Sequence, residues 1–230
     1  MTDTLTPADE LAARRQPAFS GEAGDYAAAR RVLLAEEIEL RRKHESVAAR
    51  RRALPPGPVI DKDYRFVDET GAEVGLKDLF GEHDTLVTFY WMFGPERARP
   101  CPVCTNLVGG IDANASDLKQ HVALKILSRS PAPRQRAFAH ERGWSGVDFV
   151  QTDDDYARDI GTLSPESGRL VVFRRDGDAV RLFWADEIGD GMEDPGQDPR
   201  GAPELAGPLW NLLDLTPAGR NPTWYPKLSY

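Results

Sequence analysis

The pattern of hydrophobic and polar residues divides the chain into a charged, helical N-terminal part and a later part rich in buried strands. Residues 22–53 contain no proline and are dense in Ala, Leu, Glu and Arg, which are strong helix formers. Hydrophobic residues recur at every seventh position of this segment, at Tyr26, Leu33, Leu40 and Val47. The pattern predicts one long amphipathic helix with a narrow hydrophobic face, ended by the prolines between positions 55 and 58.

The later part of the chain alternates between predicted strands and helices. Thr85–Met92 is an unbroken run of β-branched and aromatic residues, typical of a central strand buried on both faces, and Val122–Leu127 resembles it. Arg169–Arg175 and Ala179–Trp184 are joined by an Asp-Gly pair, which favours a hairpin. Strand–helix–strand units imply parallel pairing in the middle of the sheet. We therefore predict an α/β fold, a thioredoxin-like mixed sheet flanked by helices, with a long N-terminal helix.

Composition shifts divide the chain into four expected segments. They are a polar tail at 1–21, the N-terminal amphipathic helix at 22–57, a thioredoxin-like domain at 58–185, and an acidic loop, helix and Pro-rich C-terminal segment at 186–230. The net charge of -8 and the pI of about 5.1 disfavour nucleic acid as a binding partner. No apolar run approaches the roughly 20 residues that span a bilayer, and no export signal precedes the helix. We therefore expect a cytoplasmic protein with no membrane or nucleic-acid partner.

The two cysteines of the chain form a Cys-Pro-Val-Cys motif at 101–104, after a predicted strand and at the start of a predicted helix. The first N–H groups of a helix lack partners and carry partial positive charge, which lowers the pKa of a cysteine at the N-cap. Pro102 then occupies the first helical position, where its missing N–H costs nothing. One turn later, Cys104 lies close enough to attack a mixed disulfide at Cys101. We therefore expect Cys101 to be the nucleophile and Cys104 the resolving thiol.

Other interpretations of the cysteine pair stay open at this point. Arg97 and Arg99 lie just upstream and add positive potential, but buried cysteines also occur as inert small hydrophobes. A zinc site needs four ligands, and the remaining nitrogen ligands show no ligand spacing: His44, His83, His121 and His140. We therefore expect redox chemistry at the pair, with no metal and no cofactor beyond an electron donor.

Several short motifs, in order along the chain, are similar to those of one bacterial protein family. Up to the cysteines they are Ala53-Leu54-Pro55, Lys62-Asp63-Tyr64, Leu79-Phe80, Met92-Phe93-Gly94-Pro95 and Cys101-Pro102-Val103-Cys104. After the cysteines they are Asp159-Ile160-Gly161, Asn211-Leu212-Leu213-Asp214-Leu215-Thr216-Pro217 and Gly219-Arg220. Together they resemble the DUF899 family of thioredoxin-like bacterial proteins over residues 26–225. The resemblance implies a thioredoxin-like fold with a long N-terminal helix, and it implies little about the substrate.

Two features separate the chain from ordinary thioredoxins. Thioredoxins place the cysteines almost directly after the strand, whereas the loop Phe93–Pro100 intervenes here, as in peroxiredoxins. Thioredoxins also have a cis-proline just before the strand that faces the cysteines. Here that strand begins with Ser-Gly-Arg at 167–169, and the nearest proline is Pro165. If Pro165 does not face Cys101, the groove that binds a substrate disulfide is altered.

The leading hypothesis is a thiol–disulfide oxidoreductase that acts on protein or small-molecule thiols and disulfides. One alternative is a peroxiredoxin-like thiol peroxidase. In peroxiredoxins the peroxidatic cysteine occupies the position of Cys104 and a threonine precedes it by three residues; here that position is Cys101, which disfavours this reading. A second alternative is a non-catalytic binding or assembly protein on a thioredoxin scaffold, and the fold alone does not separate these.

The length of the predicted helix suggests a partner. Thirty-two residues at 22–53 extend roughly 48 Å at 1.5 Å per residue. A compact domain of this kind has a radius of gyration of about 13 Å, so its sheet cannot cover the whole hydrophobic face of a projecting helix. We therefore expect the helix to pack across a second copy and form a homodimer.

Overall fold

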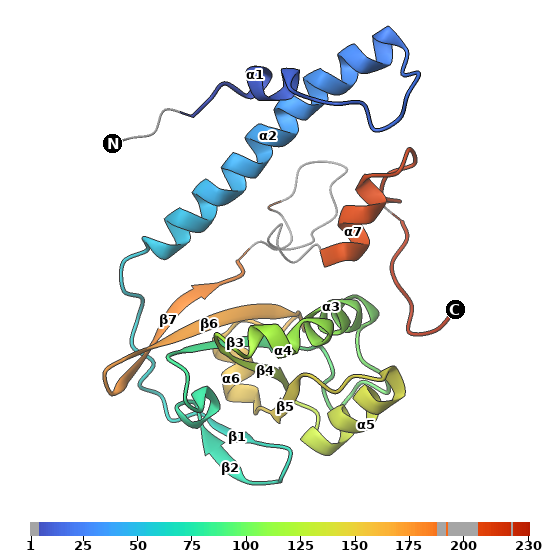
Figure 1. Cartoon of the computed structure of the whole chain (residues 1–230). Helices are drawn as coiled ribbons and strands as arrows, with labels where there is room; N and C mark the ends of the chain where they lie inside the picture. Colours follow the sequence, from blue (N-terminus) through green and yellow to red (C-terminus); the bar gives the residue numbers. More distant parts are fainter. Residues whose placement is uncertain (1–4, 188–191, 193–206, 222) are drawn as a thin grey trace. The chain divides into compact units, whose positions relative to one another are not determined.

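The computed structural model describes residues 5–187, 192, 207–221 and 223–230, which fall into two compact units (Figure 1). The first unit spans Met1–Pro55 and the second spans Pro56–Tyr230. Most of the acidic loop expected at 186–200, and the predicted start of the last helix at 204–206, lie outside the described residues.

The N-terminal unit contains a short helix and a long one. Helix α2 spans Gly24–Arg52, which confirms the long helix expected at 22–53. Helix α1, Ala8–Ala13, lies within the expected polar tail and contacts α2. Its alanines explain the difference, because alanine is the best helix former and its small side chain allows close approach. Ala12 is buried there, and Arg42 of α2 donates a hydrogen bond to the carbonyl of Thr6 over 2.6 Å.

The predicted hydrophobic face of α2 is present and uncovered. Tyr26, Leu33 and Leu40 are 57%, 48% and 70% exposed, and no residue of α2 is buried. Helix α1 therefore leaves most of this face open.

The second unit is built on a sheet of seven strands in the order β2-β1-β5-β4-β3-β6-β7 (Figure 1). In chain order the strands are β1 Arg65–Val67, β2 Glu73–Gly75, β3 Thr85–Tyr90, β4 Ala123–Ser128, β5 Asp148–Gln151, β6 Arg169–Asp176 and β7 Ala179–Ala185. The three middle strands β3, β4 and β5 are parallel, and β6 and β7 form the expected antiparallel hairpin at one edge. The remaining hairpin, β1 and β2, pairs antiparallel with β5.

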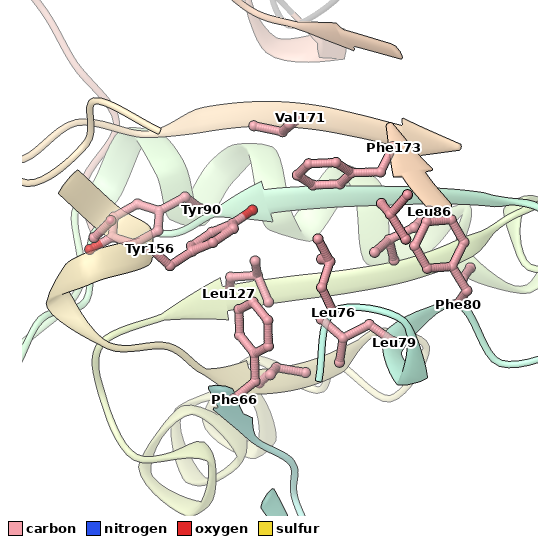
Figure 2. Close-up of a cluster of buried hydrophobic side chains, with 14 residues drawn as sticks. Phe66, Leu76, Leu79, Phe80, Leu86, Tyr90, Leu127, Tyr156, Val171 and Phe173 are labelled. Carbon is pink, nitrogen blue, oxygen red and sulfur yellow. The ribbon is translucent and has the colours of Figure 1, made fainter. Parts of the chain in front are cut away.

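Alternating side chains of β3 belong to two hydrophobic clusters, one on each face of the sheet. On one face, Leu86 and Tyr90 pack with residues that include Phe66, Phe80 and Tyr156, as Figure 2 shows. On the other face, Phe89 and the following Trp91 pack with Cys104, Val108, Phe138 and Trp144. Because a strand buried on both faces needs hydrophobic residues at every position, the unbroken run in the sequence is accounted for.

Helices cover both faces, which confirms the predicted thioredoxin-like arrangement. They are the 3₁₀-helix η1 Asp78–Phe80 and the α-helices α3 Pro102–Ala113, α4 Ala115–Leu118, α5 Ala132–Arg142, α6 Asp154–Asp159 and α7 Gly207–Asp214. Side chains of α3 and α5 enter the cluster around Trp91, and those of η1 and α6 enter the cluster around Tyr90. No helix of the described part is long and apolar enough to cross a bilayer.

Helix α3 differs from the prediction at its glycines. Glycine is a poor helix former, so the pair Gly109 and Gly110 favours a break, but the helix continues through both and ends at Asn114. The ring of Trp144 lies 3.4 Å from where a Cβ of Gly109 would be, which is ordinary contact distance, so the indole packs against the helix at this glycine. The Asn114 side chain donates to the carbonyl of Gly110 over 2.8 Å and so satisfies one carbonyl of the last turn.

Candidate functional site

The cysteine motif lies where the sequence placed it, at the start of α3 and at the carboxyl end of β3. Cys101 is the N-cap residue in an extended conformation (φ -61°, ψ 126°), and Pro102 occupies the first turn. The carbonyl of Cys101 accepts the N–H of Thr105 over 2.9 Å and its hydroxyl over 2.8 Å. The N–H of Cys101 donates to the carbonyl of Met92 over 3.0 Å, which closes the loop between β3 and α3.

The two thiols have different environments. Both cysteines are free, but Cys101 is partly exposed whereas Cys104 is 7% exposed and belongs to the hydrophobic cluster around Trp91. A reagent from solution therefore reaches Cys101 more readily than the buried Cys104.

Electrostatics separates the thiols further. The pKa of Cys101 is lowered to about 6, first by a hydrogen bond from the Cys104 thiol and then, against the effect of burial, by the N–H groups of Cys104 and Val103 and the charge of Arg97. The same hydrogen bond and burial raise the pKa of Cys104. At neutral pH the arrangement therefore holds a thiolate at Cys101 and a protonated thiol at Cys104, which is the ionisation that nucleophilic attack requires.

Gly168, at the turn into β6, lies directly against Cys104. A Cβ at Gly168 would be 2.9 Å from the Cys104 Sγ and 3.2 Å from the Phe89 ring, closer than a side chain tolerates. The peptide bond before Pro165 is cis, but Pro165 is exposed and Gly168 is the residue packed on the thiol. The sequence left open whether Pro165 faces the cysteines, and the Ser-Gly-Arg sequence at 167–169 was the available signal for Gly168.

The loop Phe93–Pro100 is held by ion pairs and ring contacts. Glu166 accepts hydrogen bonds from the N–H of Gly94, over 3.3 Å, and from the Arg97 guanidinium. Arg99 pairs with Glu141 of α5 over 2.7 Å and lies over the Phe138 ring. Of the two arginines expected to add positive potential, Arg97 therefore pairs with Glu166 and lowers the pKa of Cys101, whereas Arg99 pairs with Glu141 of α5.

Other candidate ligands are not gathered around the cysteines. Across the described residues, no three His, Cys, Asp or Glu side chains cluster in a way that could hold a metal ion. The Asp-Asp-Asp sequence at 153–155 serves α6 instead. Asp153 accepts the N–H of Tyr156 as the N-cap, Asp154 pairs with Arg129, and Asp155 pairs with Arg158.

Comparison with known proteins identifies the family. The family model described as "Bacterial protein of unknown function (DUF899)" matches residues 16–230. A search of curated proteins gives no match.

Solved structures resemble the chain at low identity. A thiol:disulfide interchange protein from Bacteroides sp. is 16% identical with a TM-score of 0.42, the match covering 59% of this chain and 83% of that chain. BsSco, of the Sco family of cytochrome c oxidase assembly proteins, is 15% identical with a TM-score of 0.39, covering 58% and 86%. Peroxidoxin BcpB from Mycobacterium tuberculosis is 17% identical with a TM-score of 0.38, covering 57% and 84%.

Proposed function

We propose that this chain, which belongs to the DUF899 family, is a thiol–disulfide oxidoreductase in which Cys101 attacks and Cys104 resolves. The observation that carries the proposal is the asymmetry of the pair. Cys101 is partly exposed and has a pKa of about 6. Cys104 is buried, has a raised pKa and donates a hydrogen bond to the Cys101 sulfur. An inert pair of buried cysteines has no such division, because burial alone raises the pKa of both thiols.

The reaction follows from the positions of the two sulfurs. The Cys101 thiolate attacks one sulfur of a substrate disulfide, forms a mixed disulfide and releases the other sulfur as a thiolate. Cys104 then loses its proton to the released thiolate and attacks the Cys101 sulfur, which frees the second substrate thiolate. The chain ends with a Cys101–Cys104 disulfide and the substrate with one thiol and one thiolate, which takes a proton from solvent, so the substrate has undergone a two-electron reduction. An external dithiol restores the pair, and we place this cycle in the cytoplasm.

A trapping experiment tests the assignment of the two roles. Incubation of Cys104→Ser with oxidised glutathione should leave a stable glutathione adduct on Cys101, because no second thiol resolves it. Wild-type protein under the same conditions should show the internal disulfide and no lasting adduct, by intact mass spectrometry. Adducts that persist on Cys104 in Cys101→Ser, and not on Cys101 in Cys104→Ser, would reverse the roles and favour a peroxiredoxin-like assignment.

The hydrophobic face of α2 supports a second proposal, a homodimer through the N-terminal helix. Leu40 is 70% exposed and Tyr26 is 57% exposed on that face, which a second copy would cover. Leu40→Glu should then shift the chain toward monomer in light scattering, while Ala28→Glu, with the same charge on the opposite face, should not. A wild-type chain that is monomeric at micromolar concentration refutes this proposal and leaves the thiol chemistry untouched.

A further inference from the structure

Glu166 ties the loop before the cysteines to the turn that packs on Cys104. Its carboxylate accepts from the N–H of Gly94 over 3.3 Å and from the Nε of Arg97. The Glu166 side chain is only 16% exposed, so the ion pair is partly shielded from water and stronger than a surface pair. Two residues further on, Gly168 contacts Cys104. One carboxylate therefore joins both segments that flank the thiols.

The backbone of Arg97 is fixed as well as its side chain. Arg134 of α5 donates to the carbonyl of Arg97 over 2.5 Å and to that of Ala98 over 3.1 Å. At Gly94, a Cβ would lie 2.8 Å from the Arg129 guanidinium and 3.0 Å from the Glu166 carboxylate, so the loop backbone lies against the ion pairs. The guanidinium of Arg97 is thus held in one place rather than free in solvent.

Arg97 lies four residues before Cys101, and its partner Glu166 lies two residues before Gly168, which packs on Cys104, so this ion pair joins the two segments that flank the thiols. Arg97 lowers the pKa of Cys101, and both cysteines in turn raise the pKa of Arg97. The other charged groups on the segments around the start of α3 are Glu96, Arg99, Arg134, Glu141, Glu166 and Arg169. Glu96 pairs with Arg129, Arg99 pairs with Glu141 and Arg97 pairs with Glu166, and Arg97 lowers the pKa of Cys101 although it is paired. Arg134 and Arg169 donate to backbone carbonyls.

We propose that Arg97 stabilises the Cys101 thiolate by its charge and that Glu166 is the positioning residue that holds Arg97 beside the thiol pair. The inference rests on the proposed function, since it assigns two further residues to the same reaction. The loop Phe93–Pro100, which separates β3 from the cysteines, then has a chemical role, because it positions the Arg97 guanidinium near Cys101.

The pH profile of Cys101 alkylation by iodoacetamide in the reduced full-length protein tests this, with mass spectrometry to assign each thiol. In Arg97→Gln the midpoint should rise, and the rate at pH 5 should fall by about threefold to tenfold, since one pKa unit is a factor of ten there. Arg97→Lys keeps the positive charge and should give a smaller shift. A purely structural role for Arg97 would change the overall rate without moving the midpoint.

Glu166→Gln separates positioning from direct charge effects. With Arg97 present, loss of the carboxylate should raise the midpoint, because the guanidinium is released. In an Arg97→Gln background the same substitution should leave the midpoint unchanged or lower it, because only a negative charge is removed. Arg99→Gln and Glu141→Gln break the matched ion pair on the other side of the loop and should leave the midpoint in place.

An unchanged midpoint in Arg97→Gln, or an equal shift in Arg99→Gln, overturns the proposal. So does a rise of the midpoint in Glu166→Gln that persists without Arg97. Alkylation needs no disulfide exchange, so this assay and the trapping experiment fail independently. A trapped adduct with an unmoved midpoint refutes the role of Arg97, and a moved midpoint with no trapped adduct refutes the oxidoreductase.

Discussion

Helices α3 and α6 of the second unit each follow a parallel strand, α3 after β3 and the loop Phe93–Pro100 and α6 shortly after β5, and their N-caps differ. At α6 the Asp153 carboxylate accepts the N–H of Tyr156 over 2.8 Å. At α3 the Cys101 side chain makes no capping hydrogen bond of ordinary geometry, although N–H groups near its sulfur lower its pKa. The first turn of α6 contains two further acids, whereas that of α3 contains none.

The N–H groups at the start of a helix bind the cap carboxylate in α6, whereas in α3 they lower the pKa of the Cys101 thiol. The Asp153 carboxylate caps α6, and a cap of this kind contributes about 1 kcal/mol to stability. A thiol offers the helix a charge only once it ionises, so the positive end of α3 acts mainly on the pKa of Cys101. With no acid in its first turn, α3 leaves that positive end uncompensated by its own side chains.

The largest effect is expected where Gly168 packs against Cys104 in the first turn of α3. Gly168→Ala forces a Cβ to within 2.9 Å of the Cys104 sulfur, a contact that real side chains do not make. We expect the free energy of unfolding in urea to fall by about 1–3 kcal/mol, the range for overpacked cores.

Two controls identify the contact responsible. Gly110→Ala, in helix α3, adds a Cβ that lies 4.0 Å from its nearest neighbour and should leave stability unchanged or raise it by about 0.5–1 kcal/mol. In a Cys104→Ala background the sulfur is gone, and Gly168→Ala should lose at least half of its effect. An equal loss in both backgrounds would assign the strain to the Phe89 ring or the Tyr90 backbone instead.

Local patterns predicted the start of α3 because every signal for it lies within a few residues. The hydrophobic run at 85–92 specified a buried strand, and Pro102 fits the first position of a helix. The low helix propensity of the glycine pair at 109–110 does not predict the course of α3. The helix continues through both residues, and Trp144 packs on Gly109.

Long-range contacts at the site could not be predicted in the same way. Glu166 meets Arg97 across 69 positions of the sequence, and Gly168 meets Cys104 only because β6 lies beside β3. A glutamate before a strand is an ordinary surface residue until the partner strand and its register are known. The sequence therefore located the candidate cysteine pair, and the fold supplied the groups that surround it.

A smaller effect is expected at the buried threonine in the first turns of α3. Thr105 accepts the indole N–H of Trp91 over 3.3 Å and donates to the carbonyl of Cys101. Thr105→Val keeps the shape and removes both bonds. Because Trp91 is fully buried, its N–H is left without an acceptor, and we expect a loss of about 1–2 kcal/mol in urea unfolding. Unchanged stability would show that the hydroxyl contributes nothing to the start of α3.

The smallest effect is expected at the matching threonine before α6. Thr152 is 3% exposed, and its hydroxyl finds no hydrogen-bond partner among the residues that the structure describes. Thr152→Val makes the same exchange of a hydroxyl for a methyl group as Thr105→Val, but it strands no donor. It removes a buried polar group that lacks a bond, so the free energy of unfolding should change by less than about 0.5 kcal/mol or increase. A loss as large as that of Thr105→Val would mean that the Thr152 hydroxyl is bonded in solution, and that α6 depends on more than its aspartate cap.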